Sequence, residues 1–188
     1  MTFDPNQTQW FYIRPKYRRE AKVKQYFEEK HCEVFIPEHE VYRMVGGKRK
    51  TYIEPIISGL VFVKTNYNQL KEEKKAMEIL GLPFMLRMNT TNHKVPIVIP
   101  EKEMEDFMFV CKSHYSKSLE GVNMDKIRKG DYVEITDGEW CGVQGYYARP
   151  YKDKCVVVLI EGVGAVCTTY IRPELLKIID KPAYEPAL

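Results

Sequence analysis

Apolar side chains in the front half of the chain recur in two different patterns. Short runs rich in aromatic and β-branched residues predict β-strands, at residues 9–14, 32–36, 38–45, 59–64 and 82–88. Longer segments with apolar residues on one face predict helices, over residues 17–30, 67–80 and 100–113. The order strand, helix, strands, helix, strand predicts an α+β sandwich with a mostly antiparallel sheet.

Turn-forming residues set the limits of these elements. Asn66 can cap the helix at 67–80, and Gly81 can end it. Gly46 and Gly47 predict a hairpin turn. Three basic residues therefore lie at or just past a hairpin tip, namely Lys48, Arg49 and Lys50. A second, polar turn is predicted at residues 89–94.

The back of the chain has the alternation of a small all-β domain. Val133 and Ile135 alternate with polar residues, as a strand with one buried face requires. Gly142 and Gly145 lie where a backbone must bend or approach another strand closely. Further β-branched runs predict strands at residues 154–160 and 165–170. Four to five short strands in about fifty residues predict a small SH3-like β-barrel.

Periodicity fades between these two parts, where small polar residues follow Ser113. Such a composition predicts a linker. We therefore divide the chain into a front domain, a linker, a barrel and a tail, at residues 1–112, 113–127, 128–180 and 181–188.

Composition fits a folded chain, because 44% of its 188 residues are hydrophobic and 12% are aromatic. Five cysteines without a Cys-x-x-Cys pair support neither a disulfide framework nor a zinc ribbon. No apolar run is long enough to span a membrane, and residues 1–9 lack the pattern of a signal peptide. We expect a cytoplasmic monomer without a membrane contact.

Catalytic motifs are missing from the sequence. The four histidines are scattered without ligand spacing, and there is no Walker loop, dinucleotide-binding glycine motif or nucleophile elbow. We expect no enzyme activity, no cofactor and no metal. A hydrolase in an unfamiliar front domain would need a perturbed acid or nucleophile in a cleft, which only a structure can reveal.

Charge is distributed unevenly, although the net charge is only +3. Residues 14–24 contain six basic residues and one acidic residue, whereas the barrel at 128–180 contains seven basic and eight acidic residues. A surface that faces phosphates is therefore expected at the front of the chain.

Two stretches resemble one family of transcription factors. Residues 130–145 (GDYVEITDGEWCGVQG) resemble the KOW motif, which occurs in ribosomal proteins and in the NusG family of elongation factors. Residues 10–13 (WFYI) and 54–63 (EPIISGLVFV) resemble the opening strand and central segment of the NusG front domain. The resemblance covers nearly the whole chain and implies an NGN-like front domain, a linker and a KOW barrel.

Departures from the family pattern indicate which branch of the family the chain resembles. Ile57 and Ser58 stand where the family usually has Phe-Pro, and Leu60 stands in place of a tyrosine. These departures are similar to those of specialised paralogues of the RfaH or UpxY type. The resemblance implies an antitermination and elongation factor that binds RNA polymerase and suppresses pausing and termination on long surface-polysaccharide operons.

The resemblance also implies a patch that receives the clamp helices of RNA polymerase. Such a patch must stay exposed on the folded domain. The candidates occupy the matching strands and are Trp10, Tyr12, Leu60 and Phe62. The alternative is that these side chains simply pack in the core.

A contact with the non-template DNA strand is a further implication. Single-stranded DNA is bound by basic residues along its phosphates and by aromatic rings that stack on its bases. The candidates lie at the first strand-to-helix corner and at the hairpin tip, and are Lys16, Tyr17, Arg18, Arg19, Lys22, Tyr26, Lys48, Arg49 and Lys50. For the hairpin, upstream duplex DNA and the polymerase lobe are both possible partners. The alternatives are a solvated helix face and a hairpin tip that is basic for edge protection.

In relatives the barrel contacts Rho or a small-subunit ribosomal protein. The implied docking surface comprises Trp140, Tyr146, Tyr147 and Val163, with packing as the alternative for the aromatic residues. The β-branched strands predict a stable barrel that does not refold into helices. The alternative function is a ribosome-associated RNA-binding protein, which the absence of excess positive charge in the barrel disfavours.

Overall fold

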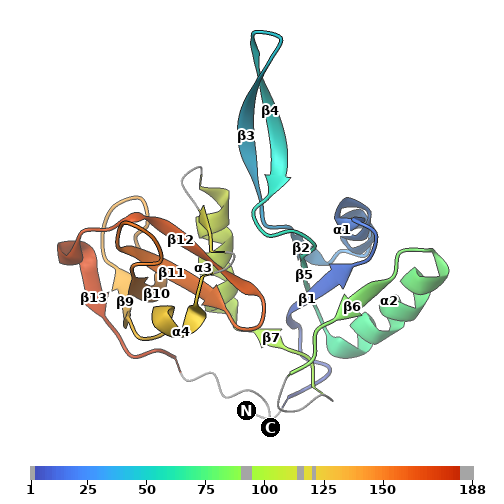
Figure 1. The fold of residues 1–188 in the computed structure, drawn as a ribbon. Helices are drawn as coiled ribbons and strands as arrows, with labels where there is room; N and C mark the ends of the chain where they lie inside the picture. Colours follow the sequence, from blue (N-terminus) through green and yellow to red (C-terminus); the bar gives the residue numbers. More distant parts are fainter. Residues whose placement is uncertain (1–2, 90–94, 114–116, 120–121, 183–188) are drawn as a thin grey trace. The chain divides into compact units, whose positions relative to one another are not determined.

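The fold is that of a computed structural model, which describes residues 3–89, 95–113, 117–119 and 122–182 (Figure 1). Its helices are α1 (Glu20–Glu29), α2 (Tyr67–Ile79), α3 (Glu101–Lys112), α4 (Met124–Ile127) and the 3-10 helix η1 (Pro173–Leu175). Its first seven strands are β1 (Gln9–Pro15), β2 (Glu33–Phe35), β3 (Glu38–Val45), β4 (Lys48–Pro55), β5 (Val61–Thr65), β6 (Phe84–Leu86) and β7 (Val98–Ile99). The remaining strands are β8 (Lys117–Ser118), β9 (Asp131–Ile135), β10 (Gln144–Ala148), β11 (Cys155–Ile160), β12 (Gly164–Tyr170) and β13 (Leu176–Ile178).

The chain divides into two compact units. The first contains the described residues up to Pro37 together with Ser58–Glu101, and the second contains Glu38–Ile57 and Lys102–Pro182. The hairpin of β3 and β4 and nearly all of α3 thus group with the second unit. The domain boundary that we drew after residue 112 stays a prediction.

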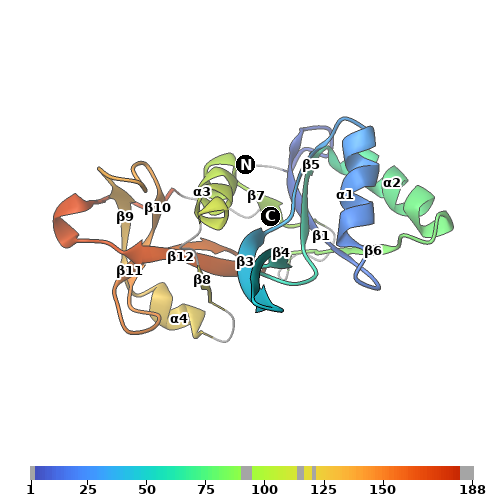
Figure 2. The same ribbon diagram turned by 90° about the horizontal axis from the view of Figure 1, so that it is seen from above.

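The first unit is built on a five-stranded antiparallel sheet. Its strand order is β2-β5-β1-β6, and the short β7 also pairs with β1. Opposite residues on β1 and β5 share a face, so Phe11 and Ile13 lie on one side with Val63 and Val61. This side is covered by α1 and α2 (Figure 2). The predicted α+β arrangement with an antiparallel sheet is confirmed for this unit.

The core beneath the two helices follows from their sequence periodicity. Val23 and Phe27 of α1 are four residues apart, and Leu70 and Met77 of α2 are seven apart, so each pair occupies one helix face. All four side chains are buried against the sheet. The predicted cap of α2 is confirmed, because Asn66 Oδ1 accepts a hydrogen bond from the backbone N–H of Gln69 at 2.8 Å.

The second unit contains a six-stranded sheet with the order β13-β9-β10-β11-β12-β8. The predicted close approach of a strand at Gly145 is confirmed. A Cβ on Gly145 would collide with the carbonyl oxygen of Val157 on the neighbouring strand. The predicted strands are present. The predicted closed barrel is not confirmed, since in the described part of the chain β13 and β8 are sheet edges that do not pair with each other.

The segment predicted as a linker is not a plain linker. It contains β8, which pairs with β12, and the short helix α4. Leu119 and Ile127 are buried in the second core together with Tyr146 and Val157. Two apolar side chains spaced along a polar segment give little periodic signal, so the sequence did not predict the strand, the helix and the buried side chains of this segment. The predicted polar turn lies largely outside the described residues, as does most of the tail.

A long β-hairpin forms the third sheet. Within the described part of the chain, strands β3 and β4 pair only with each other, in register from Glu38 opposite Pro55 to Val45 opposite Lys48 (Figure 1). Gly46 and Gly47 both have positive φ, 59° and 76°, as a tight turn of this kind requires. The predicted hairpin is confirmed, and β4 begins directly after the two glycines, at Lys48.

Candidate nucleic-acid interface

The corner between β1 and α1 has an unusual backbone. Tyr17 and Arg18 are consecutive non-glycine residues in the left-handed region, with φ of 62° and 52°. Left-handed conformations cost non-glycine residues roughly 1–2 kcal/mol each. They also end any helical geometry, which is why α1 begins at Glu20 and not at residue 17 as periodicity predicted.

Neighbouring segments hold this corner in place. The backbone N–H of Lys16 donates to the carbonyl oxygen of Pro83 at 2.9 Å. The Arg19 guanidinium donates to the carbonyl oxygen of Gly81 and lies 5.8 Å from the centre of the Tyr17 ring. Arg19 therefore acts mainly as an anchor, a role that its place in a basic run did not reveal.

The anchored corner presents its remaining side chains to solvent. Lys16, Arg18 and Lys22 are exposed, and Tyr17 is 75% exposed. An exposed aromatic ring between two cations matches the requirements of single-stranded nucleic acid, which offers phosphates and unstacked bases. Strain of this kind persists only where the surroundings fix it, and it is concentrated at functional sites.

A small hollow beside the corner adds residues that the sequence did not suggest. It has a volume of about 200 Å³ and is lined by Lys16, Lys74, Glu78, Pro83, Phe84 and Met85. Lys74 comes from α2, so tertiary structure places its ammonium group on the same hollow as Lys16. No motif links these positions, because they are separated by more than fifty residues.

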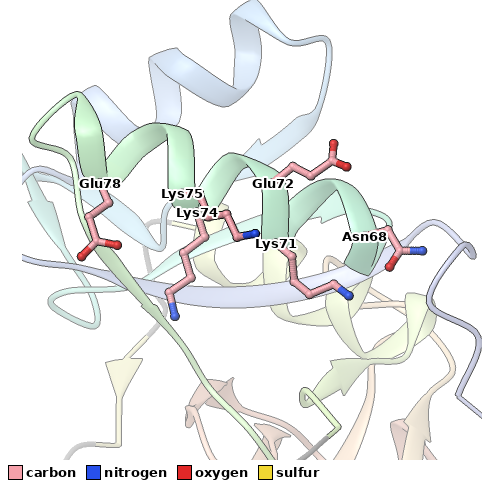
Figure 3. Close-up of a pocket in the computed structure, with 6 residues that line it drawn as sticks. All are labelled: Asn68, Lys71, Glu72, Lys74, Lys75 and Glu78. Atoms are coloured by element: carbon pink, nitrogen blue, oxygen red, sulfur yellow. The ribbon is translucent and has the colours of Figure 1, made fainter.

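The outer face of α2 is a separate, mixed-charge surface. A shallow hollow of about 680 Å³ is lined by Asn68, Lys71, Glu72, Lys74, Lys75 and Glu78 (Figure 3). Lysines and glutamates alternate around it, so it favours neither an anion nor a cation strongly. We therefore include only Lys74, which also borders the corner, in the candidate interface.

Tyr26, also predicted to stack on bases, is only partly exposed, so its role in the interface stays a prediction. Its hydroxyl donates to Glu73 Oε2 at 2.6 Å, and its ring packs edge-on against Phe27. Burial, and then the hydrogen bond to Glu73, raises the pKa of Tyr26. The ring is half-buried because α1 and α2 face each other here, which the sequence of α1 alone does not contain.

The four strand residues predicted to form an exposed apolar patch are covered in this structure, and their role in binding RNA polymerase stays a prediction. Trp10, Leu60 and Phe62 are 0% exposed and Tyr12 is 1% exposed. Trp10 Nε1 donates to Glu101 Oε1 at 3.4 Å, while the rings of Tyr12 and Phe62 lie 6.4 Å apart. Burial raises the pKa of Tyr12. The central pair of strands, β1 and β5, is covered on both faces, which explains why these runs are continuously apolar.

The predicted docking residues of the second sheet are also largely covered. Trp140 is 4% exposed, and its ring meets the Phe109 ring of α3 edge-on, with centroids 6.1 Å apart. Tyr146 is buried, Val163 is half-buried, and the Tyr147 hydroxyl donates to the Ile171 carbonyl at 3.1 Å. Packing, the alternative that the sequence left open, thus holds for Trp140 and Tyr146.

Polar contacts fix α3 on this sheet. Asp106 accepts a hydrogen bond from the backbone N–H of Gln144 at 3.3 Å and pairs with Lys102 at 2.6 Å. Lys102 also donates to the Gly142 carbonyl at 2.8 Å. Burial raises the pKa of Asp106, and burial raises the pKa of Glu103 as well. The Asp106 carboxylate thus links α3 to the backbone of β10.

Comparison with known protein families finds a match over the front part of the chain. Residues 8–108 match the model of a protein family described as "Transcription termination factor nusG". This match covers more than half of the chain, and the chain belongs to the NusG family. No curated protein matches it. Among the described residues, no helix combines the length and apolar character needed to cross a lipid bilayer.

Proposed function

We propose that this protein is a transcription elongation and antitermination factor that binds RNA polymerase and holds the non-template DNA strand at its basic corner. Family membership supports the polymerase partner. The observation that carries the DNA contact is the left-handed corner, which presents Lys16, Tyr17 and Arg18 together. Such a factor favours one state of a large enzyme by binding it, and needs no chemistry of its own.

The corner would bind the strand through three kinds of contact. Lys16, Arg18 and Lys22 would neutralise successive phosphates, and the Tyr17 ring would stack on a base. Lys74 would add a charge from α2 across the small hollow. The anchor formed by Arg19 and Gly81 keeps these groups at fixed separations, so less ordering is needed on binding.

The polymerase contact is not assigned to the four strand residues that the sequence suggested. Trp10, Tyr12, Leu60 and Phe62 are buried, and a contact through them would require this sheet face to open. We propose the contact for the chain as a whole and leave its surface to experiment.

Two narrower parts of the proposal rest on sequence. Departures at Ile57, Ser58 and Leu60 support a specialised paralogue of the RfaH or UpxY type, acting on long surface-polysaccharide operons. The motif at residues 130–145 supports a KOW barrel for the second sheet, with Rho or a ribosomal protein as its partner. Because Phe109 covers Trp140, that partner would have to use other residues or displace α3.

The polymerase half of the proposal is tested by a pull-down with purified RNA polymerase. Polymerase that lacks the tip of its clamp helices is the comparison. We expect recovery with the intact enzyme and loss with the truncated one. Equal recovery from both would refute docking at the clamp helices, and no recovery from either would refute the polymerase partner.

The DNA half is tested by removing two charges from the corner. Lys16→Ala with Arg18→Ala should weaken binding to a bubble template at moderate salt. The slope of log affinity against log salt should fall by about 1.4, from two single-strand phosphate contacts at about 0.7 each. Polymerase recovery should stay nearly unchanged.

Lys126→Ala with Lys129→Ala is the matched control, because it removes the same charge from exposed residues of the second unit. The DNA contact at the corner is rejected if this control lowers template affinity as much as the corner variant does.

A further inference from the structure

We infer that the β3–β4 hairpin is a second nucleic-acid contact, which inserts into the major groove of double-helical B-form DNA. This goes beyond the proposed single-strand contact and depends on neither the polymerase nor the corner. The sequence left duplex DNA and a protein surface as alternatives for the hairpin tip. The register and contacts of the two strands favour the duplex.

Charge separates along the length of the hairpin. Its distal half, residues 42–51, contains four basic residues and no acidic one, while its acidic residues lie toward the base. The basic residues are Arg43, Lys48, Arg49 and Lys50. In the described part of the chain, no ion pair involves Lys48, Arg49 or Lys50, and all three are exposed. Only Arg43 has an acidic partner, Glu54.

The strand register distributes this charge over both faces of the ribbon. Side chains directly opposite each other share a face, and faces alternate along a strand. Arg43 therefore lies on one face with Lys50 and Lys48, whereas Arg49 lies on the other face with Met44. A groove in a double helix has a phosphate backbone on each wall. A ribbon with cations on both faces can contact both walls at once.

The opposed pair of Arg43 and Lys50 brings two cations together on one face of the ribbon. Like charges directly opposite each other are destabilising, and here the ion pair between Glu54 and Arg43 offsets part of this repulsion. A phosphate would therefore be bound chiefly by Lys50, with Arg43 shared between the phosphate and Glu54.

The dimensions of the tip match the major groove. The three residue pairs from Arg43–Lys50 to Val45–Lys48 are two residue steps long, about 7 Å at roughly 3.4 Å per residue. The major groove of B-DNA is about 12 Å wide and about 8.5 Å deep, and admits a two-stranded ribbon. The minor groove is only about 6 Å wide. At the tip, Gly46 and Gly47 have no side chain to keep the backbone from the groove floor.

A protein surface is the weaker fit. The face opposite Arg43 carries Tyr42, Met44 and Ile53, all exposed. The Arg49 guanidinium lies 3.7 Å from the centre of the Tyr42 ring and so covers the middle of this row. Met44 and Ile53 remain as separated apolar side chains, which is less than the buried aromatic centre of a typical protein interface.

The test uses the whole 188-residue chain without polymerase. Affinity for a fluorescent duplex DNA of mixed sequence is measured by anisotropy across a salt series, for the wild type and for Lys48→Ala/Arg49→Ala/Lys50→Ala. We expect the variant to bind weakly, with a salt slope lower by about 2.7, from three phosphates at about 0.9 each. Because these residues are exposed, the variant should fold as the wild type does, which circular dichroism checks.

Three comparisons make the result specific. Lys126→Ala/Lys129→Ala/Lys152→Ala removes equal charge from other exposed positions and should leave most of the duplex affinity. Lys16→Ala/Arg18→Ala should reduce binding to single strands but not to duplex, so failure of the corner proposal and of this one are distinguishable. An A-form RNA duplex of the same sequence should bind weakly, because its major groove is deep and narrow.

Chemical protection identifies the groove. Dimethyl sulfate methylates guanine N7 in the major groove and adenine N3 in the minor groove. We expect the wild type to protect N7, and the hairpin variant to lose that protection. Protection at adenine N3 instead would overturn the assignment to the major groove. Unchanged duplex affinity in the variant would overturn the contact itself.

Discussion

The basic corner and the basic hairpin tip both expose cationic side chains. The corner belongs to a packed body, whereas the hairpin tip does not. The corner is strained, but hydrogen bonds to Pro83 and Gly81 hold it against a fully packed body. The hairpin is unstrained at its glycine turn, yet among the described residues its strands pair with no other strand, and most of its side chains are exposed. Packing can therefore fix an unfavourable geometry, whereas a two-stranded ribbon has little packing to do so.

The largest expected effect comes from making the same isoleucine-to-alanine substitution in the packed body and in the hairpin. Ile13 on β1 is 0% exposed, and Ile53 on the hairpin is 65% exposed. Ile13→Ala should lower the free energy of unfolding by about 2–5 kcal/mol. Ile53→Ala should change it by no more than about 0.5 kcal/mol. Urea denaturation followed by tryptophan fluorescence measures both.

An equal loss of unfolding free energy in the two variants would contradict this expectation, because it would show that Ile53 is packed against other residues in solution. An unchanged stability of Ile13→Ala would show that the first core is not closely packed.

The next expected effect tests the strain at the corner. Tyr17→Gly replaces a left-handed tyrosine with the residue that adopts this conformation without a steric cost, and should stabilise the protein by about 1 kcal/mol. The same change removes the exposed ring, so single-strand affinity should fall by about 1–3 kcal/mol. Thermal unfolding and anisotropy with a single-stranded oligonucleotide measure the two effects.

Tyr151→Gly is its control, since Tyr151 is exposed but has no left-handed backbone. It should give no stabilisation and no change in affinity. A destabilised Tyr17→Gly protein would show that the ring itself, and not the strain, dominates at this position.

The smallest expected effect concerns a charged side chain that lies in packed structure, unlike the exposed charges of the hairpin. Burial is the main cause that raises the pKa of Glu103, with nearby Glu161 and Asp106 adding to it and Lys181 opposing it. For an acid whose folded pKa is raised, stability is greatest at low pH and is lost as pH rises through the folded pKa. At neutral pH, Glu103→Gln should therefore raise the melting temperature by a few degrees at most.

The increase in melting temperature caused by Glu103→Gln should shrink as the pH falls toward about 4.3, the pKa of an unperturbed glutamate. Melting curves between these pH values, with Glu139→Gln as the exposed control, measure the trend. An advantage that is constant with pH would show that ionisation of Glu103 is not its cause.

Sequence predicted most local structure because local physics sets it. The hairpin turn follows from Gly46 and Gly47, and the cap of α2 follows from Asn66, since both depend on a few neighbouring residues. The start of α1 was predicted three residues too early, because left-handed Tyr17 and Arg18 are fixed by contacts with the distant Gly81 and Pro83. Periodicity has no access to such contacts.

The candidate site was predicted only in part for the same reason. Lys16, Tyr17 and Arg18 are exposed as a basic run suggests, but Arg19 is an anchor and Tyr26 is bound to Glu73. Lys74 joins the site only because α2 packs beside the corner. Aromatic strand residues such as Trp10 and Phe62 have the same sequence pattern whether buried or exposed, and here they are buried.

The sequence by itself determined most of the elements and their order, the uneven charge and the resemblance to a family, because each of these depends on residue types and their spacing. Only the tertiary structure decided which apolar faces are covered, which cations are anchors, and which face of the hairpin each basic residue occupies. These depend on which segments meet in space, and a residue's burial is set by its partners and not by its own side chain.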